Sequence, residues 1–425
     1  MKEIYLDKID ITIYYEKLKN GLQVFFVPIK DKKKYYMTYA TKYGSIDTSF
    51  VPNGKNKEIK TSDGIAHFLE HKLFESEDGI DPFEFFAKSG SVGNASTSFE
   101  STQYLCYGTR AFEENLDHLL TYVNNLYLTY ENVEKEKGII EEELKMYEDI
   151  PEYVLQFAIR KNLYHVHPNR IDIGGTVESV RKTTKEELET CYNTFYQPNN
   201  MFLIVSGNFN KDIAIDIVHK KLDSNQNKNK NIKRKKYKEP NTVYKEQETI
   251  KRDIAIPKAA VAFKFDKSVL GEFNDEVLET YLAMFTALAF GEASKFREVA
   301  RERNLLNSFS SEWEIVDNYR SLLLFLESKD IDAFIDLVIK ELKNIEVTEE
   351  DIERIKKVWI ANSVKVTDYV EDMANIVYDD VVKYGRMIDK RMDIIKNVNK
   401  KKLDTIISNM NFKNKAIVKL LPEEK

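Results

Sequence analysis

Two histidines and a glutamate in the segment His67-Phe68-Leu69-Glu70-His71 constrain the fold of this chain more than any other feature. Side chains at positions i, i+3 and i+4 of an α-helix lie on one face. A helix over this segment therefore turns the imidazoles of His67 and His71 toward one point, with Glu70 beside them, displaced by one residue. We expect the histidines to ligate one metal ion and Glu70 to hold a water molecule. This order, the reverse of His-Glu-x-x-His, is a zinc signature.

A third ligand must come from elsewhere, because a catalytic zinc ion takes three protein ligands and leaves one position for water. The best source is the glutamate-rich segment 134–146, whose apolar residues fit a helix with one buried side. Glu136 and Glu143 are seven residues apart, which is two helical turns, so both can face one place. The consecutive glutamates at 141–143 leave the register open, and Glu142 is the alternative ligand.

The motif also has a simpler interpretation, because short motifs match by chance and glutamate-rich helix faces are usually only solvated. Its flanks favour the metal site. Phe68, Leu69, Leu73 and Phe74 surround the histidines with apolar side chains. Polar groups in such surroundings are costly without partners, and a metal ion supplies one to both imidazoles.

Four stretches carry a wider similarity that runs in order through residues 20–210. They are Asp63–Glu75; Gly93–Ser98 with Thr102 and Tyr104; Glu136–Ile140 running to Glu143, Met146, Asp149 and Pro151; and His167-Pro168 with Gly175-Thr176 and Tyr196–Met201. In these stretches the chain resembles the pitrilysin/insulinase family of zinc metallopeptidases. The resemblance is greatest to the short bacterial chains that are similar to mitochondrial processing peptidase.

The resemblance implies roles for the residues at matching positions. His67, His71 and Glu143 would ligate one zinc ion per chain, which favours Glu143 over Glu142. Glu70 would be the general base. Glu136 would be a catalytic-site residue that tunes a ligand histidine without touching the metal.

Substrate-binding residues are implied in both halves of the chain. Asn94, Ala95 and Ser96 would lie on a sheet edge to which an extended peptide adds as a strand. Family members also offer an arginine and a tyrosine from the second domain, in a stretch like Arg-Glu-x-x-Gly-Leu-x-Tyr. Arg301 matches the arginine, whereas Asn307 stands at the tyrosine position after a one-residue deletion. The alternative interpretation of this stretch is a solvated helix end.

The missing tyrosine suggests a division of labour between two related chains. This chain would carry the zinc, and a related partner without zinc ligands would carry the arginine and tyrosine. We therefore expect a heterodimer, with a homodimer as the second choice.

Composition and charge exclude several other classes of protein. The net charge is −6, with no basic excess, so nucleic acid is not an expected partner. The start of the chain has no apolar signal region, and the longest apolar stretch, near residues 282–290, is too short to span a membrane. Cys106 and Cys191 are expected to be buried thiols in a reducing compartment. We expect a cytoplasmic protein without a membrane partner.

Residues 223–243 contain few apolar side chains and are predicted to be a solvated, mobile linker, in which the basic run Lys233–Lys236 serves solubility. This linker separates residues 1–222, the predicted zinc-binding domain, from residues 244–425, a domain of similar length and element order without a second motif. The family resemblance implies an α+β fold. Its two homologous domains, each a mostly antiparallel sheet packed with helices, would form half of a clamshell.

Strands are expected at residues 23–29, 35–43, 202–206, 259–265 and 416–421, two more within 96–110, and helices at 112–126, 274–290, 331–342 and 349–364.

The sequence is compatible with three functions. The first is a zinc endopeptidase that hydrolyses peptides or unfolded segments in an enclosed chamber, with Glu70 as base. The second is a non-catalytic structural subunit of the same fold in a peptidase-like assembly, which would not need to keep all four residues of the centre. The third is a binding module stabilised by zinc, which is disfavoured because structural zinc sites usually have four protein ligands and often cysteine.

Overall fold

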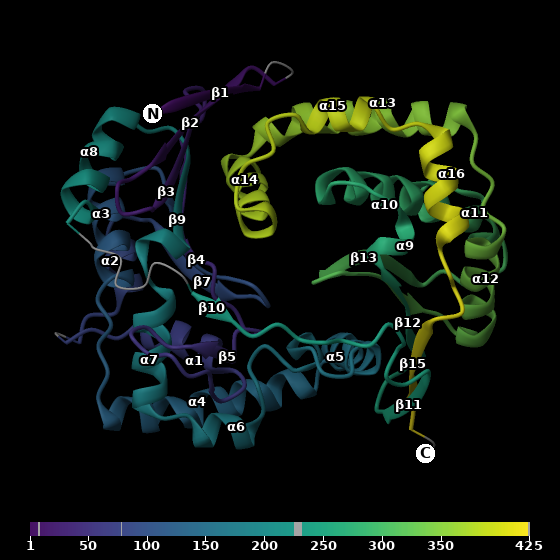
Figure 1. Cartoon of the computed structure of the whole chain (residues 1–425), viewed down its shortest axis with the longest axis horizontal. Helices are drawn as coiled ribbons and strands as arrows, with labels where there is room; N and C mark the ends of the chain where they lie inside the picture. Colours follow the sequence, from purple (N-terminus) through teal and green to yellow (C-terminus); the bar gives the residue numbers. More distant parts are fainter. Residues whose placement is uncertain (7–8, 78, 225–231, 424–425) are drawn as a thin grey trace. The chain divides into compact units, whose positions relative to one another are not determined.

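The computed structural model describes residues 1–423 except 7–8, 78 and 225–231 (Figure 1). The chain forms two compact units, neither of which is continuous in sequence. Unit 1 contains residues 1–144, 172–236 and 362–389, and unit 2 contains residues 145–171, 237–361 and 390–425. The predicted domains, 1–222 and 244–425, were each continuous. In the structure, residues 145–171 belong to unit 2, although the predicted boundaries put them in the first domain. Residues 362–389 belong to unit 1, although those boundaries put them in the second domain.

Unit 1 is built on a seven-stranded sheet with the order β1-β2-β3-β9-β4-β8-β7. Only β3 and β9 pair in parallel. The strands are β1 (Lys2–Leu6), β2 (Ile11–Lys17), β3 (Gln23–Pro28), β4 (Tyr35–Thr41), β7 (Val92–Thr97), β8 (Thr102–Gly108) and β9 (Met201–Gly207). The central strands β4 and β9 are buried along their whole length, as expected for strands covered on both faces. A small sheet of β10 (Lys233–Arg234), β5 (Ser49–Val51) and β6 (Ile59–Lys60) accompanies it.

Helices pack on both faces of the sheet of unit 1. Phe26, Met37 and Val205 face a core shared with several helices, whereas their neighbours on the opposite face, such as Phe25 and Ile204, pack against α14 (Val370–Tyr384). This division follows the period-two alternation of strand side chains. The other helices of this unit are α1 (Ile65–Lys72), α2 (Pro82–Lys88), α3 (Phe112–Val123), α6 (Val177–Lys182), α7 (Lys185–Phe195), α8 (Lys211–Leu222), the 3₁₀ turn η2 (Pro198–Asn200) and most of α4 (Tyr130–Glu148).

Unit 2 repeats this arrangement in a five-stranded sheet with the order β11-β15-β12-β14-β13. Its first and last strands in sequence pair in parallel and the other pairs are antiparallel, as for β3-β9-β4-β8-β7 in unit 1. The strands are β11 (Gln247–Arg252), β12 (Lys258–Asp266), β13 (Ser308–Val316), β14 (Tyr319–Glu327) and β15 (Lys415–Pro422). The shared topology supports the prediction of two related domains, and the α+β fold class is confirmed.

The helices of unit 2 also cover both faces of their sheet. On one face, α5 (Pro151–Leu163) packs Leu155, Ile159 and Leu163 against Ala260 and Leu323. Thus α5 covers unit 2 as α14 covers unit 1. The other elements of unit 2 are α9 (Lys267–Leu270), α10 (Asp275–Phe290), α11 (Lys295–Glu302), α12 (Ile331–Lys343), most of α13 (Glu349–Lys365), α15 (Arg391–Lys396), α16 (Lys400–Asn409) and η1 (Pro168–Arg170). The 3₁₀ turn η3 (Val366–Asp368) lies in the segment 362–389 and belongs to unit 1.

The predicted linker, 223–243, is held in place over much of its described length. Lys233 and Arg234 pair with β5, and Arg234 Nε lies 2.7 Å from the buried carboxylate of Asp47. The interpretation of this basic run as a purely solubilising segment is therefore wrong for Arg234. The part of the linker at 225–231 lies outside the described residues.

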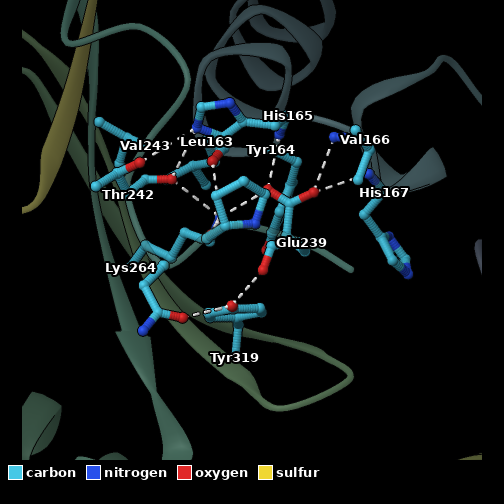
Figure 2. Close-up of polar contacts among 12 residues, drawn as sticks. Leu163, Tyr164, His165, Val166, His167, Glu239, Thr242, Val243, Lys264 and Tyr319 are labelled. Atoms are coloured by element: carbon cyan, nitrogen blue, oxygen red, sulfur yellow. Dashed lines mark hydrogen bonds and ion pairs between the residues drawn. The ribbon is translucent and has the colours of Figure 1, made fainter. Parts of the chain in front are cut away.

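A buried ion pair fixes the end of the linker in unit 2 (Figure 2). Glu239 accepts hydrogen bonds from the backbone N–H groups of His165, Val166 and His167 at 2.7, 2.8 and 2.9 Å. Lys264 Nζ donates to Glu239 Oε1 at 2.8 Å, and the two side chains are 0% and 1% exposed. Burial acts to raise the pKa of Glu239. The hydrogen bonds from Lys264 and from the three N–H groups outweigh burial and hold the pKa below its ordinary value. The carboxylate is therefore ionised, and it anchors the linker to the turn after α5.

None of the helices in the described part of the chain combines the length and the apolar content that crossing a membrane requires.

Candidate metal centre

Helix α1 carries the first three residues of the centre, and its start is fixed by a glycine. Gly64 precedes the helix with φ +85°, in the left-handed region that favours glycine. A Cβ at this position would lie 2.2 Å from the backbone oxygen of Gly174. The helix then buries Ile65, Phe68 and Leu69 in the core of unit 1 and presents its histidines on another side.

His67 and His71 meet Glu143 of α4. The Nε2 atoms of the two histidines lie 3.7 and 3.4 Å from Glu143 Oε2, and one ligand atom from each residue lies within 4.8 Å of the others. Glu142, the alternative third ligand, has an exposed side chain and is not part of this group.

The donor set and its spacing fit a zinc ion. Two imidazole nitrogens and a carboxylate oxygen are ordinary zinc ligands, with bonds of about 2.0–2.2 Å. Ligand atoms at the corners of such a tetrahedron stand about 3.3–3.5 Å apart. The Nε2–Oε2 distances of 3.4 and 3.7 Å are close to these values.

Glu136 orients one of the two imidazoles. Its Oε1 lies 3.0 Å from His71 Nδ1, and because an ionised carboxylate can only accept, Nδ1 is the donor. This bond leaves Nε2 for a metal ion. Burial raises the pKa of Glu136, but His71 and then Lys72 lower it to below its ordinary value.

The two imidazoles differ in their protonation when no metal is bound. Burial, together with the nearby His71, lowers the pKa of His67 to about 4, although Glu143 and Glu136 act in the opposite direction. Burial also acts to lower the pKa of His71, but the hydrogen bonds to Glu136 and Glu143 raise it to about 9. At neutral pH, therefore, His67 is neutral and His71 is protonated, so a metal ion must displace one proton from His71.

Glu70 stands apart from the three converging atoms, as the motif predicts for a residue that holds water. Its side chain is buried, and Thr97 Oγ1, at the end of β7, donates to Glu70 Oε2 at 2.6 Å. Burial raises the pKa of Glu70 even though the Thr97 hydrogen bond opposes the shift. The carboxylate is thus a stronger base than a solvated glutamate. Sequence reasoning assigned no role to Thr97.

The predicted substrate residues on β7 lie on the edge strand of the sheet of unit 1. Asn94 and Ser96 are exposed and Ala95 is half-buried, in a regular alternation. β7 pairs with β8 on one side, and the second side of an edge strand presents backbone groups that can pair with another chain.

Arg301, the predicted substrate residue in unit 2, is on α11 with a side chain that is 56% exposed. Its Nη2 lies 2.6 Å from Glu292 Oε2. Asn307, at the position expected for the tyrosine, is exposed. The geometry of Arg301 is also that of a solvated helix end, the alternative considered from the sequence.

Comparisons with known proteins match nearly the whole chain. A sequence profile described as insulinase (peptidase family M16) matches residues 49–177, and one described as peptidase M16 inactive domain matches residues 182–358. The "Uncharacterized zinc protease YmfH" of Bacillus subtilis is 38% identical over 385 residues, covering 88% of each chain. The beta subunit of mitochondrial-processing peptidase from Caenorhabditis elegans is 27% identical over 40% of this chain and 38% of its own.

A solved structure shares the fold over almost its full length. It is a putative M16-like peptidase from Alicyclobacillus acidocaldarius, with a TM-score of 0.89 and 29% identity, covering 97% of this chain and 99% of that one.

Proposed function

The chain belongs to the insulinase (M16) family of peptidases, and from this premise we propose that it is a zinc metalloendopeptidase of peptides and unfolded segments. The proposal rests chiefly on one observation, the convergence of His67, His71 and Glu143 beside the buried carboxylate of Glu70. The names of the relatives, zinc proteases among them, support peptide hydrolysis and zinc.

We assign His67 Nε2, His71 Nε2 and Glu143 as the ligands of one zinc ion per chain. When bound, zinc polarises the scissile carbonyl and lowers the pKa of the attacking water. Glu136 holds the His71 ring by its Nδ1, so that the ring can present Nε2 without rotating.

Glu70 is the general base in this proposal. Its Oε2 accepts from Thr97, so Oε1 faces the proton of the attacking water and later returns that proton to the leaving amine. The pKa of Glu70, raised by burial, makes it a more effective proton acceptor near neutral pH.

The substrate binds as an added strand along β7, beside Asn94, Ala95 and Ser96. Backbone pairing fixes the direction of an extended chain without reading its sequence. A peptide paired there lies next to Thr97, the last residue of β7, which contacts Glu70. This arrangement favours peptides and unfolded segments, which can adopt an extended form, over folded proteins. The enclosing chamber remains an expectation from the family.

A related partner chain completes the enzyme in our proposal, with a homodimer as the second choice. Arg301 is present without the expected tyrosine, and a similar C. elegans protein is named as a subunit. Sedimentation of the protein with and without a co-expressed related chain tests this. Full peptide cleavage by the lone chain would contradict the heterodimer. The two buried free cysteines, Cys106 and Cys191, fit the cytoplasmic location we propose.

The test of the catalytic proposal is Glu70→Gln, with Glu77→Gln, an exposed glutamate seven residues further on, as the matched control. We expect Glu70→Gln to keep its zinc and to lose at least about a hundredfold in cleavage of a quenched, unstructured peptide. Glu77→Gln should match the wild type in both. Unchanged cleavage by Glu70→Gln would rule out Glu70 as the base. A wild type that binds zinc but cleaves no unstructured peptide, either alone or with a co-expressed related chain, would favour the alternative, a structural subunit.

A further inference from the structure

Lys72, the residue after the second histidine, has a fully buried side chain, 0% exposed. Its ammonium has three partners. Nζ lies 3.0 Å from the backbone oxygen of Asn132, 2.7 Å from Glu75 Oε1 and 3.5 Å from Glu136 Oε2. Sequence reasoning gave no role to this lysine.

Burying an ammonium costs desolvation free energy unless the group is paired, so the partners of Lys72 indicate its role. Glu75 is 30% exposed and can be solvated without the lysine. The side chain of Glu136 is only 8% exposed, and its carboxylate lies between two groups, Lys72 on Oε2 and His71 on Oε1. Glu136 is therefore the partner that depends most on the lysine.

Lys72 also joins the two helices of the centre. It belongs to α1, whereas Asn132 and Glu136 belong to α4, which carries Glu143 about two turns beyond Glu136 and about three beyond Asn132. Its bonds to Asn132 and Glu136 thus connect α1 to the first turns of α4, the helix that supplies the third ligand. Lys137, the next residue after Glu136, points elsewhere and pairs with Glu134 at 2.6 Å.

We propose that Lys72 is a positioning residue of the metal centre, holding Glu136 so that its second oxygen fixes His71 with Nε2 toward the metal ion. The inference rests on the proposed function, because it assumes that His71 is a ligand. Without the ammonium, the Glu136 carboxylate loses the charge on one side and is free to turn, and His71 loses the acceptor that sets its tautomer and orientation. Partners of this kind typically change metal affinity by about 10–100-fold when removed.

The experiment measures zinc affinity by competition with a chromophoric chelator, for Lys72→Met and for Lys72→Gln. Methionine fills the space without a charge, and glutamine retains a donor for the Asn132 carbonyl. We expect both variants to bind zinc about 10–100-fold more weakly than the wild type. The matched control, Lys137→Met, removes a lysine adjacent to Glu136 and should bind within about twofold of it, because its ion pair is elsewhere.

A double-mutant cycle with Glu136→Gln separates positioning from general support of the fold. If Lys72 acts through Glu136, Lys72→Gln should have little further effect on zinc affinity in the Glu136→Gln background. Equal losses in both backgrounds would overturn the proposal. So would wild-type affinity in either lysine variant, or loss of folding in both, which would assign Lys72 to the fold alone.

A cobalt-loaded sample gives a second readout. The visible absorption of bound cobalt reports ligand geometry, so the spectrum should change in Lys72→Gln and stay unchanged in Lys137→Met. A wild type that binds neither zinc nor cobalt would refute the proposed function itself, a result distinct from any difference among the lysine variants.

Discussion

Removing one member of the buried pair Glu239–Lys264 should destabilise unit 2 by an amount that depends on which member is removed. In Lys264→Met, the carboxylate of Glu239 loses its cation but keeps three backbone N–H bonds. We expect a loss of about 3 kcal/mol in the free energy of unfolding, the lower end for breaking a buried pair. Glu239→Gln leaves the ammonium without a counter-charge, although Lys264 Nζ keeps the backbone oxygens of Leu163, Pro240 and Thr242 as acceptors. It also turns an NH₂ group toward one or two of those N–H groups. The loss should be about 5 kcal/mol, because each orphaned N–H adds about 1–3 kcal/mol.

The double variant is the stronger test, because it leaves no unpaired charge. Its loss should be about 2–3 kcal/mol smaller than the sum of the two single losses. Urea unfolding followed by tryptophan fluorescence reports the stability of unit 2, since the two tryptophans, Trp313 and Trp359, both lie in that unit. The exposed pair Lys400–Asp404, also in unit 2, provides the control, and Lys400→Met should change stability by less than about 0.5 kcal/mol. Strict additivity, or a Lys264→Met loss below about 1 kcal/mol, would refute this reasoning.

Three further predictions concern the glycine at the start of α1, the hydrogen bond that supports Glu70, and the loss of stability at acidic pH. Gly64→Ala should cost more than about 2 kcal/mol in thermal unfolding, because a left-handed φ and a Cβ 2.2 Å from the Gly174 oxygen are both unfavourable; a wild-type melting temperature would contradict this. Thr97→Val should lower kcat about tenfold or more with zinc retained, by leaving Glu70 Oε2 without its donor, and Thr97→Ser should restore it; equal kcat in both variants would exclude this role. Glu239 has a folded-state pKa below its ordinary value of about 4.3, so its contribution to stability is complete above that pH and is lost as the pH falls further. Urea midpoints between neutral pH and pH ~3 should therefore fall less in Glu239→Gln than in the wild type.

The local elements of this fold could be predicted because their sequences carry their own period. The helix over His67–His71 follows from residue spacing, β9 follows from a continuous apolar run, and β4 follows from a segment rich in aromatic and β-branched residues. The predicted helices at 274–290 and 331–342 agree with α10 and α12 to within a residue or two.

The placement of α5 in unit 2 and of α14 in unit 1, each across the predicted domain boundary, could not be predicted in the same way. The apolar residues of α14, among them Met373 and Val377, tell which side of the helix is buried but not which sheet it covers. Its partners, such as Phe25 and Phe202, lie far away in the sequence. The domain boundaries drawn at a polar segment were therefore continuous, whereas the compact units are not.

The residues of the candidate centre also differ in whether local sequence spacing could predict them. His67, Glu70 and His71 are fixed by short-range spacing, and the family resemblance favoured Glu143 over Glu142. Lys72 and Thr97 were missed because their importance lies in contacts with distant residues. A lysine followed by Leu73 and Phe74 was a signal of burial that the sequence contained. The contribution of Glu239 was hidden for the opposite reason, since it sits in a segment whose composition indicates solvent.

The central claim is that His67, His71 and Glu143 ligate one metal ion, and zinc content tests it most directly. Glu143→Gln and Glu142→Gln are matched changes to neighbouring glutamates of α4, only the first of which faces the two imidazoles. After dialysis against a weak chelator, we expect about one zinc ion per chain in the wild type and in Glu142→Gln, and a small fraction of that in Glu143→Gln. Equal zinc in all three proteins, or a zinc-free wild type that still cleaves peptides, would contradict the account.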